Sequence, residues 1–439
     1  MPQNTIGLIK GWATLSLGDV EERLAGGDAE LEGFYGPDEA AELRVLATTQ
    51  PRAQLDGPRP RVVILPGIMG SLLQTTQGLI DLLWVNPVAF LKGKVNLIEM
   101  DETGERDADP RVHVIPTSLE MLYYTKFALS LDKQVDLLQF PYDWRRDIRK
   151  LAGDLRAALE RWAAGEDRKF TLVGHSMGGL VSRAYMALYP QEAAQRVERL
   201  IMLGTPNHGA PEAVRTLILG NDLMNLAHKL NQENDGNSLV RRLPAIYQIL
   251  PAPPGIWPNA AYPADFDLYD ARAWPIAGLS QRFLDGGREF WNLLAASDPQ
   301  IPHHLIAGCN LETTTAVRIQ PGAGGVDGRP ALQVTRARAD LAGGDGTVPL
   351  ASALLRQTPT YFVQCEHAKL PGHREVIAAV VDLAYGRQPS LPTEIAAAPR
   401  DLAAPRSPID LDAEATALRQ RIADGTLTAQ DLEKLYFLQ

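Results

Sequence analysis

The sequence predicts an α/β fold with a mostly parallel central sheet, helices on both faces and inserted cap segments. Three observations lead to this prediction. From residue 61 onward, short apolar runs alternate with helical patterns; one of these runs ends in a serine flanked by glycines; and two long intervals interrupt the alternation. Strands separated by helices imply a parallel sheet, because each crossover returns the chain to the same end of the sheet. The 439 residues are enough to bury a sizeable core.

Six apolar runs are predicted to be the strands of that sheet. They are Arg61–Leu65, Val135–Phe140, Lys169–Val173, Val197–Leu203, His304–Ala307 and Thr360–Gln364. Between the second and third runs, apolar side chains recur at helical spacing over residues 151–162, which predicts a helix with one apolar face on the sheet. The intervals 74–130 and 207–300 are too long for structureless loops in a compact domain, so we predict that they are caps over the functional face.

The two ends of the chain differ in composition from the middle. Residues 1–58 form a leader whose role the sequence does not reveal, and the main domain is predicted over 59–388. Proline and alanine dominate 389–410, which predicts an extended linker. Residues 411–439 are predicted to be a helical tail, with Thr428 capping its second helix. Two interpretations of this apolar tail stay open: a docking surface for a protein partner, or packing against its own domain.

Composition and charge exclude several classes of protein. The formal net charge of −10 and the lack of a basic block argue against nucleic acid as a partner. Only Cys309 and Cys365 are available for disulfides, and we interpret both as buried small hydrophobes. Neither a signal-like N-terminal segment nor a run of 18 apolar residues occurs. We therefore expect a cytoplasmic protein, with peripheral contact to a membrane surface as an open alternative.

A serine between two glycines gives the clearest chemical signal. Residues 174–178 read Gly-His-Ser-Met-Gly, directly after a predicted strand and before a helical stretch. When a strand turns at once into a helix, the serine hydroxyl is exposed at the end of the sheet. Glycines two residues to either side remove the resulting clash. Ser176 is therefore the candidate nucleophile.

A serine nucleophile needs a neutral imidazole to take its proton and a carboxylate to orient that imidazole. In a sheet of this kind they follow in the order serine, acid, histidine. Asp345, inside the glycine-rich segment 342–349, is the candidate acid, with Asp340 as the fallback. His367, two residues after the last predicted strand, is the candidate base. His373 competes with it, but begins a helical stretch where capping or exposure is expected.

Acyl transfer also needs two backbone N–H groups that point at the developing oxyanion. Met177, directly after the nucleophile, is one candidate donor. The second is Met69, in the glycine-flanked turn that follows the first predicted strand. This chemistry requires no cofactor and no metal, and we predict neither.

Five segments, taken in order, resemble the lecithin:cholesterol acyltransferase family. They are Pro66–Ser71, Pro141–Arg145, Gly174–Gly179, Gly204–Gly209 and Gly344–Pro349. The resemblance covers about residues 61–386 and implies an α/β-hydrolase fold with a lipid acyl ester as substrate. It also implies a triad of Ser176, Asp345 and His367, an acyl-enzyme intermediate, and Met69 as the second oxyanion donor.

Two of these segments carry further expectations. Tyr142–Arg145 match a family signature, and we assign them structural work at a strand end. His208 is expected to line the pocket wall rather than to act as a base. The secreted animal members use disulfides and a signal peptide, which this sequence lacks, so cholesterol and lipoproteins are not carried over as substrates.

We therefore expect a serine-dependent, phospholipase-like lipid acyl hydrolase or acyltransferase. Two alternatives stay open: an esterase acting on a non-membrane acyl ester, and a hydrolase fold that serves as a binding module. The linker and apolar tail also fit the lipid-attacking module of a larger effector. Trp84, Trp257 and Trp274 are expected either to line an acyl pocket or face a membrane, or to form the core of the caps.

Overall fold

A six-stranded parallel sheet lies at the centre of the molecule, in the order β11-β8-β7-β6-β1-β5. The structure is a computed structural model that describes residues 11, 15–50, 58–76, 81–84, 86–220, 222–297, 300–320, 330–339, 343–395 and 410–432. The strands are β1 (Arg61–Leu65), β5 (Asp136–Gln139), β6 (Phe170–His175), β7 (Val197–Leu203), β8 (His303–Gly308) and β11 (Thr360–Val363). Each lies within two residues of a predicted strand, so the predicted fold class is confirmed.

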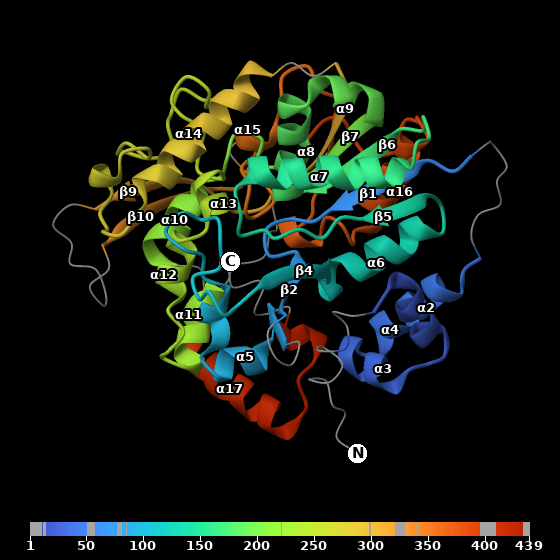
Figure 1. Ribbon diagram of the computed structural model, residues 1–439, viewed down its shortest axis with the longest axis horizontal. Coiled ribbons are helices and arrows are strands. Elements are labelled where there is room, and N and C mark those ends of the chain that lie inside the picture. Colours follow the sequence, from blue (N-terminus) through green and yellow to red (C-terminus); the bar gives the residue numbers. More distant parts are fainter. Residues whose placement is uncertain are drawn as a thin grey trace.

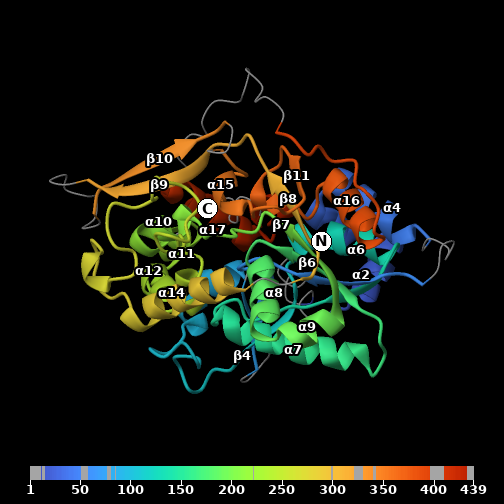
Figure 2. The same cartoon turned by 90° about the horizontal axis from the view of Figure 1, so that it is seen from above.

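Helices cover both faces of this sheet (Figures 1 and 2). One face carries α7 (Ile148–Ala163), α8 (Met177–Leu188) and α9 (Pro190–Arg196), and the other carries α6 (Met121–Asp132) and α16 (Arg374–Ala384). The predicted helix over 151–162 is the central part of α7, and its apolar stripe is buried. Cover on both sides explains why the central strands read as continuous apolar runs.

The first predicted cap is shorter than the interval 74–130. It is built on a small antiparallel sheet of β3 (Asp81–Trp84), β2 (Ser71–Thr75) and β4 (Val114–Leu119), with α5 (Pro87–Leu91) and η1 (Lys94–Ile98) beside it. The following helix, α6, packs against the main sheet and α16 rather than within the insertion. The inserted part therefore ends near Leu119.

The second predicted cap, 207–300, is helical and continues past its expected end. Its elements are α10 (Pro211–Leu219), α11 (Asp222–Leu230), α12 (Gly236–Arg241), α13 (Pro244–Tyr247), η2 (Ala271–Ala273) and α14 (Gln281–Ala296). An antiparallel hairpin of β9 (Thr313–Ile319) and β10 (Leu332–Ala337), which the sequence did not predict, packs against α10. Figure 1 shows this hairpin and the helices α10 to α14 grouped at one end of the sheet.

The predicted leader and tail both contain folded helices. In the leader, α2 (Leu17–Ala25), α3 (Ala29–Tyr35) and α4 (Pro37–Thr48) lie against α6. In the tail, α17 (Leu411–Asp424) packs on α11, which favours packing of this part on its own domain. Thr428 exchanges hydrogen bonds with Asp431 as a cap of the next helix. Residues 396–409 of the predicted linker and 433–439 of the tail lie outside the described residues.

The three tryptophans singled out in the sequence are core residues of the caps. Trp84 is fully buried, and Trp257 and Trp274 are nearly so. Each indole N–H donates to a backbone carbonyl nearby: those of Met69, Ala261 and Leu268, respectively. None of the three lines the pocket at the active serine, so the acyl-pocket interpretation was wrong. Within the described residues, no helix is both long and apolar enough to cross a bilayer.

A buried arginine joins the first cap to the end of β5. Arg145 is 1% exposed, and its guanidinium makes two bonds of 2.8 Å to the carboxylate of Asp143. It also donates to Asp107 at 2.8 Å and to the carbonyl of Ile98 at 3.0 Å. Trp144 beside it donates to the carbonyl of Ser71. The signature Tyr142–Arg145 therefore does structural work at a strand end, as predicted.

We expect Arg145→Met to lower the free energy of unfolding by about 3–5 kcal/mol, because it leaves the buried carboxylate of Asp143 and the partly buried one of Asp107 without their counter-charge. Arg146→Met is the matched control: Arg146 pairs with Asp154 at the surface, where such a pair contributes less than about 1 kcal/mol. Urea unfolding of both variants measures the difference. Equal losses would show that the buried cluster adds nothing beyond an exposed ion pair.

His208 follows β7 and holds the second cap to the main domain. Its backbone N–H and its Nδ1–H both donate to the carbonyl of Ser352, in α15 (Leu350–Ala353). The pocket that contains Ser176 is not lined by His208, so the expectation of a pocket-wall residue was wrong. Burial lowers the pKa of His208 to about 4, because the charged ring would lose its hydration.

This pKa makes stability depend on pH. In the unfolded chain a histidine titrates near 6.5, so between pH 6.5 and 4 the unfolded state takes up a proton that folded His208 does not bind. Above pH 6.5, His208 makes no pH-dependent contribution to the free energy of unfolding. Because of His208, we expect the free energy of unfolding to fall by roughly 2 kcal/mol between there and pH 5. Urea unfolding at pH 7 and pH 5 should show a smaller drop for His208→Gln than for the wild type. An identical drop in both would contradict the assignment.

Candidate active site

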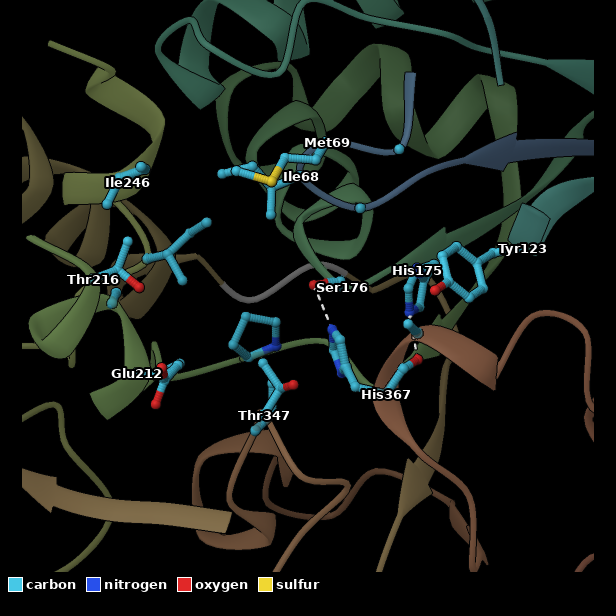
Figure 3. Close-up of a pocket in the computed structure, with 18 of the residues that line it drawn as sticks. Ile68, Met69, Tyr123, His175, Ser176, Glu212, Thr216, Ile246, Thr347 and His367 are labelled. Atoms are coloured by element: carbon cyan, nitrogen blue, oxygen red, sulfur yellow. Dashed lines mark hydrogen bonds between the residues drawn. The ribbon is translucent and has the colours of Figure 1, made fainter. Parts of the chain in front are cut away.

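Loops from the carboxyl ends of the strands meet at one place beside the caps. The turn after β1, the junction of β6 with α8, the loop at Asp345 and the short helix η5 (His367–Lys369) after β11 all reach it. In a parallel sheet these ends share one edge, so residues far apart in sequence come together there. Figure 3 shows Ser176 at the centre of this region, with His367 beside it.

The junction of β6 and α8 is the abrupt strand-to-helix turn, or nucleophile elbow, that the glycine-flanked serine predicts. Ser176 adopts φ 52° and ψ −122°, a conformation that L-residues rarely occupy. A Cβ on Gly174 would lie 2.4 Å from the backbone nitrogen of Gly179, and one on Gly178 would lie 2.3 Å from the carbonyl oxygen of Leu65. Both contacts are with backbone, so no side chain fits there. The glycines at 174 and 178 are thus required by the close approach, as the spacing predicted.

The structure brings together the three residues predicted as nucleophile, base and acid. His367 Nε2 lies 2.9 Å from Ser176 Oγ, and His367 Nδ1 lies 2.7 Å from Asp345 Oδ2. Because the carboxylate can only accept, Nδ1 carries the proton and Nε2 is left to accept the serine O–H. Ser176 and His367 are each 8% exposed, and Asp345 is 2% exposed. This arrangement matches the geometry that serine-based acyl transfer requires.

Asp345 is fixed by its own loop. Its Oδ1 accepts the backbone N–H groups of Thr347 at 3.0 Å and Val348 at 2.7 Å, which leaves Oδ2 for the imidazole. Its carbonyl accepts the N–H of His367 at 2.9 Å, so acid and base are linked through the backbone as well. Gly346 has φ 93°, which permits the tight turn.

His373, the competing base, does not enter the site. His373 is the residue directly before α16, as predicted, but its side chain makes no capping hydrogen bond there, and its ring does not line the pocket. Asp340, the fallback acid, lies outside the described residues. Cys309 and Cys365 are buried and unbridged, in agreement with their interpretation as small core residues. Burial raises the pKa of the Cys365 thiol to about 12, so it stays protonated.

Both predicted oxyanion donors border the nucleophile. Met177 is the first residue of α8, so its N–H belongs to the free N-terminal end of that helix. Met69 lines the same pocket in the turn after β1, with φ 63°. The turn lies close to the nucleophile, since a Cβ on Gly67 would be 3.0 Å from that of Ser176. The role of Met69 as a donor stays a prediction.

A cavity of about 140 Å³ opens at Ser176, and apolar side chains make most of its wall. The aliphatic lining residues are Ile68, Met69, Ala210, Ala213, Ile246, Ile249, Val348 and Ala368. Figure 3 shows Ile68 and Met69 on the side opposite Glu212 and Thr347, with Ser176 between them. Glu212 is paired with Arg215 on α10. The cavity wall is therefore mostly apolar, with the polar side chains of Glu212 and Thr347 facing Ile68 and Met69.

Sequence reasoning missed two polar residues at the site, Tyr124 and His175. Tyr124 is on α6, and its hydroxyl lies 2.7 Å from Nδ1 of His175, the residue before the nucleophile. His175 Nε2 lies 3.0 Å from the carbonyl oxygen of His367. The only signal for His175 was its place inside the glycine-serine motif, and Tyr124 carried none.

A metal site would require several histidine, cysteine, aspartate or glutamate side chains close together among the described residues. No group of three or more histidine, cysteine, aspartate or glutamate side chains there is arranged to hold a metal ion. The reactive side chains that the structure brings together at the site are those of Ser176, His367 and Asp345.

Comparisons with known proteins bear on the family. The sequence profile described as lecithin:cholesterol acyltransferase matches residues 127–275. Phospholipase A(1) LCAT3 of Arabidopsis thaliana is 34% identical to this chain over 90 residues, which are 20% of each protein. The match thus spans about a fifth of the relative's length.

Two solved structures are similar to parts of this chain. A chain in the crystal structure of the Tle4-Tli4 complex has a TM-score of 0.51 at 15% identity, covering 75% of this chain and 98% of that one. The mature lipase BlEst2 of Bacillus licheniformis has a TM-score of 0.41 at 17% identity, covering 76% of this chain and 96% of that one. Over residues 127–275 the chain is therefore similar in sequence to the lecithin:cholesterol acyltransferase family.

Proposed function

We propose that this protein is a serine-dependent acyl hydrolase or acyltransferase that cleaves glycerolipid esters through an acyl-enzyme intermediate. The observation that carries the proposal is the hydrogen-bonded series Asp345, His367 and Ser176 at the mouth of an apolar cavity. The similarity of residues 127–275 to the lecithin:cholesterol acyltransferase family supports a lipid acyl hydrolase or acyltransferase in the broad sense. The triad and the intermediate are our proposal for how it works.

In the first half-reaction, Ser176 Oγ attacks the ester carbonyl carbon while its proton passes to His367 Nε2. Asp345 accepts the Nδ1–H of the imidazolium that forms and stabilises its charge. The carbonyl oxygen becomes an oxyanion, which the N–H groups of Met177 and Met69 would bind. The tetrahedral intermediate collapses, the C–O bond to the leaving alcohol breaks, and His367 returns the proton to that alcohol.

In the second half-reaction, water or an acceptor alcohol attacks the acyl-serine carbonyl. His367 takes the proton of the attacking O–H and later delivers it to Ser176 Oγ, which leaves as the hydroxyl. The serine is thus regenerated, with a fatty acid or a new ester as the product. The same residues perform both versions, so the acceptor alone separates hydrolase from transferase.

The lining of the cavity supports an acyl chain as its occupant. A mostly apolar wall favours a hydrocarbon chain over a polar one, because burying apolar surface is favourable by about 25 cal/mol per Å². Glu212 and Thr347, on the opposite side, suit the polar part of a glycerolipid. The expected cytoplasmic location with peripheral membrane contact stays a prediction, as does a protein partner for the tail.

We expect the wild type, but not Ser176→Ala, to release fatty acid and lysolipid, or to form a new acyl ester, from a mixed phospholipid and neutral-lipid extract. The alanine removes the nucleophile, so the rate should fall by at least about 10⁴-fold. Mass spectrometry of the products measures this and identifies the lipid. No change in the extract with either protein would reject a lipid substrate and favour a soluble ester or a binding function.

Repeating the incubation with a long-chain alcohol shows whether water or an alcohol accepts the acyl group. A new ester formed in competition with free fatty acid supports transfer. Free fatty acid alone, at every alcohol concentration, rejects the transferase version and leaves the hydrolase.

A further inference from the structure

His175 is buried beside the nucleophile, and neither of its ring nitrogens takes part in the proposed reaction. Both are nonetheless engaged: Nδ1 with the hydroxyl of Tyr124 at 2.7 Å, and Nε2 with the backbone carbonyl of His367 at 3.0 Å. The rings of His175 and His367 lie 5.0 Å apart, between centroids. A buried polar side chain with every position satisfied constrains its neighbours, because each bond would be costly to break.

The directions of these bonds follow from what each group can do. The backbone N–H of Gly67 can only donate, and it lies 2.8 Å from the Tyr124 oxygen. The Tyr124 hydroxyl accepts that bond and donates its own proton to His175 Nδ1. His175 is then protonated on Nε2, which donates to the carbonyl of His367, a group that can only accept. One consistent arrangement therefore runs from Gly67 through Tyr124 and His175 to His367.

Neither Tyr124 nor His175 changes its protonation near neutral pH. Burial holds the pKa of His175 well below its usual value, and the neighbouring His367 adds to the effect. Burial also raises the pKa of the Tyr124 hydroxyl. His175 therefore stays neutral and Tyr124 stays a donor, so the bond directions persist while the enzyme works.

The series joins the two loops that must be placed correctly around Ser176. Gly67 belongs to the turn that carries the predicted donor Met69, and His367 is the base. These loops follow β1 and β11, which lie on opposite sides of β6 in the sheet. His175, at the end of β6, lies between them, and α6 supplies Tyr124 from the layer next to the sheet.

Each loop also has an anchor outside the series. The hydroxyl of Tyr142 donates to the carbonyl of Pro66, in the turn after β1. The backbone N–H of His367 donates to the carbonyl of Asp345 at 2.9 Å. Cutting the series should therefore loosen the loops without unfolding them.

We propose that Tyr124 and His175 are positioning residues. They hold the turn that contains Gly67 and Met69, and the loop that contains His367, in the correct positions around Ser176. This inference rests on the proposed function and adds to it two residues that touch neither the serine hydroxyl nor the developing charge. Misplacement of an oxyanion donor or a base by a fraction of an ångström lowers the rate of chemistry more than it lowers binding. Substitutions that break the series should therefore lower kcat and leave KM nearly unchanged.

The test compares Tyr124→Phe with Tyr35→Phe on a soluble chromogenic ester, p-nitrophenyl butyrate. Tyr35, on α3, is buried to a similar degree, and its hydroxyl bonds to α6, at the carbonyl of Met121 and the hydroxyl of Thr125. Both variants lose one buried hydroxyl, so their melting temperatures should fall by similar amounts. We expect kcat per titrated serine to fall 10- to 100-fold for Tyr124→Phe and less than twofold for Tyr35→Phe, with KM within twofold for both.

A second pair of variants tests His175 and covers the case in which Tyr124→Phe does not fold. Glutamine offers one acceptor and one donor near the positions of the two ring nitrogens, whereas leucine offers neither. We expect His175→Gln to retain at least tenfold more kcat than His175→Leu when both are compared as folded protein. Equal kcat for these two, or equal kcat for Tyr124→Phe and Tyr35→Phe, would overturn the positioning role.

Failure of this inference is distinguishable from failure of the proposed function. If the wild type cleaves the ester, Ser176→Ala does not, and the positioning variants match their controls, the series is merely structural and the function stands. If Ser176→Ala cleaves the ester as fast as the wild type, the proposed function fails, and the positioning role fails with it.

Discussion

The turn from β6 into α8 is the constraint on which the rest of the site depends. Ser176 stands there with a positive φ, in a conformation that costs of order 1–3 kcal/mol and persists only where the surroundings enforce it. Backbone atoms on both sides of the serine enforce this conformation. Backbone from Gly179 and Leu65 comes within 2.4 Å of where side chains at Gly174 and Gly178 would begin. Buried strands on both sides of β6 leave the chain no room to relax.

The acid and the base of the site are positioned around this fixed serine. Asp345 is held by two N–H groups of its own loop, and it holds His367 through both side chain and backbone. The orientation of His367 is therefore set by the loop of Asp345, which is separate from the turn at Ser176. Such a site requires the turn after β1 and the loop of His367 both to be placed correctly around Ser176. The hydrogen-bonded series through Tyr124 and His175 connects these two segments directly.

Much of this could be predicted from the sequence, for identifiable physical reasons. Strands buried on both faces read as continuous apolar runs, which made β1, β6 and β7 easy to find. Ser176 was marked by the glycines that the elbow needs. Asp345 and His367 were found by their order in the chain and by their places in loops.

The remainder depends on packing between distant segments, which leaves little local signal. Helix α6 is buried on nearly all sides, so it has no single apolar stripe, and it was absorbed into the predicted cap. The hairpin of β9 and β10 is mostly polar and half-exposed, so it did not read as strands. Trp84 and Tyr124 are ordinary aromatic residues in sequence. Only the fold shows that one fills a core and the other bonds to His175.

Active-site labelling tests most directly the claim that His367 and Asp345 make Ser176 a nucleophile. The purified protein is treated with a fluorophosphonate, and the adduct is located by peptide mass spectrometry in the wild type, in His367→Ala and in Asp345→Asn. We predict one adduct, on Ser176, formed at least about 10³-fold more slowly in His367→Ala and slowed also in Asp345→Asn. An adduct on another residue, or labelling of Ser176 at the same rate in all three proteins, would contradict the claim.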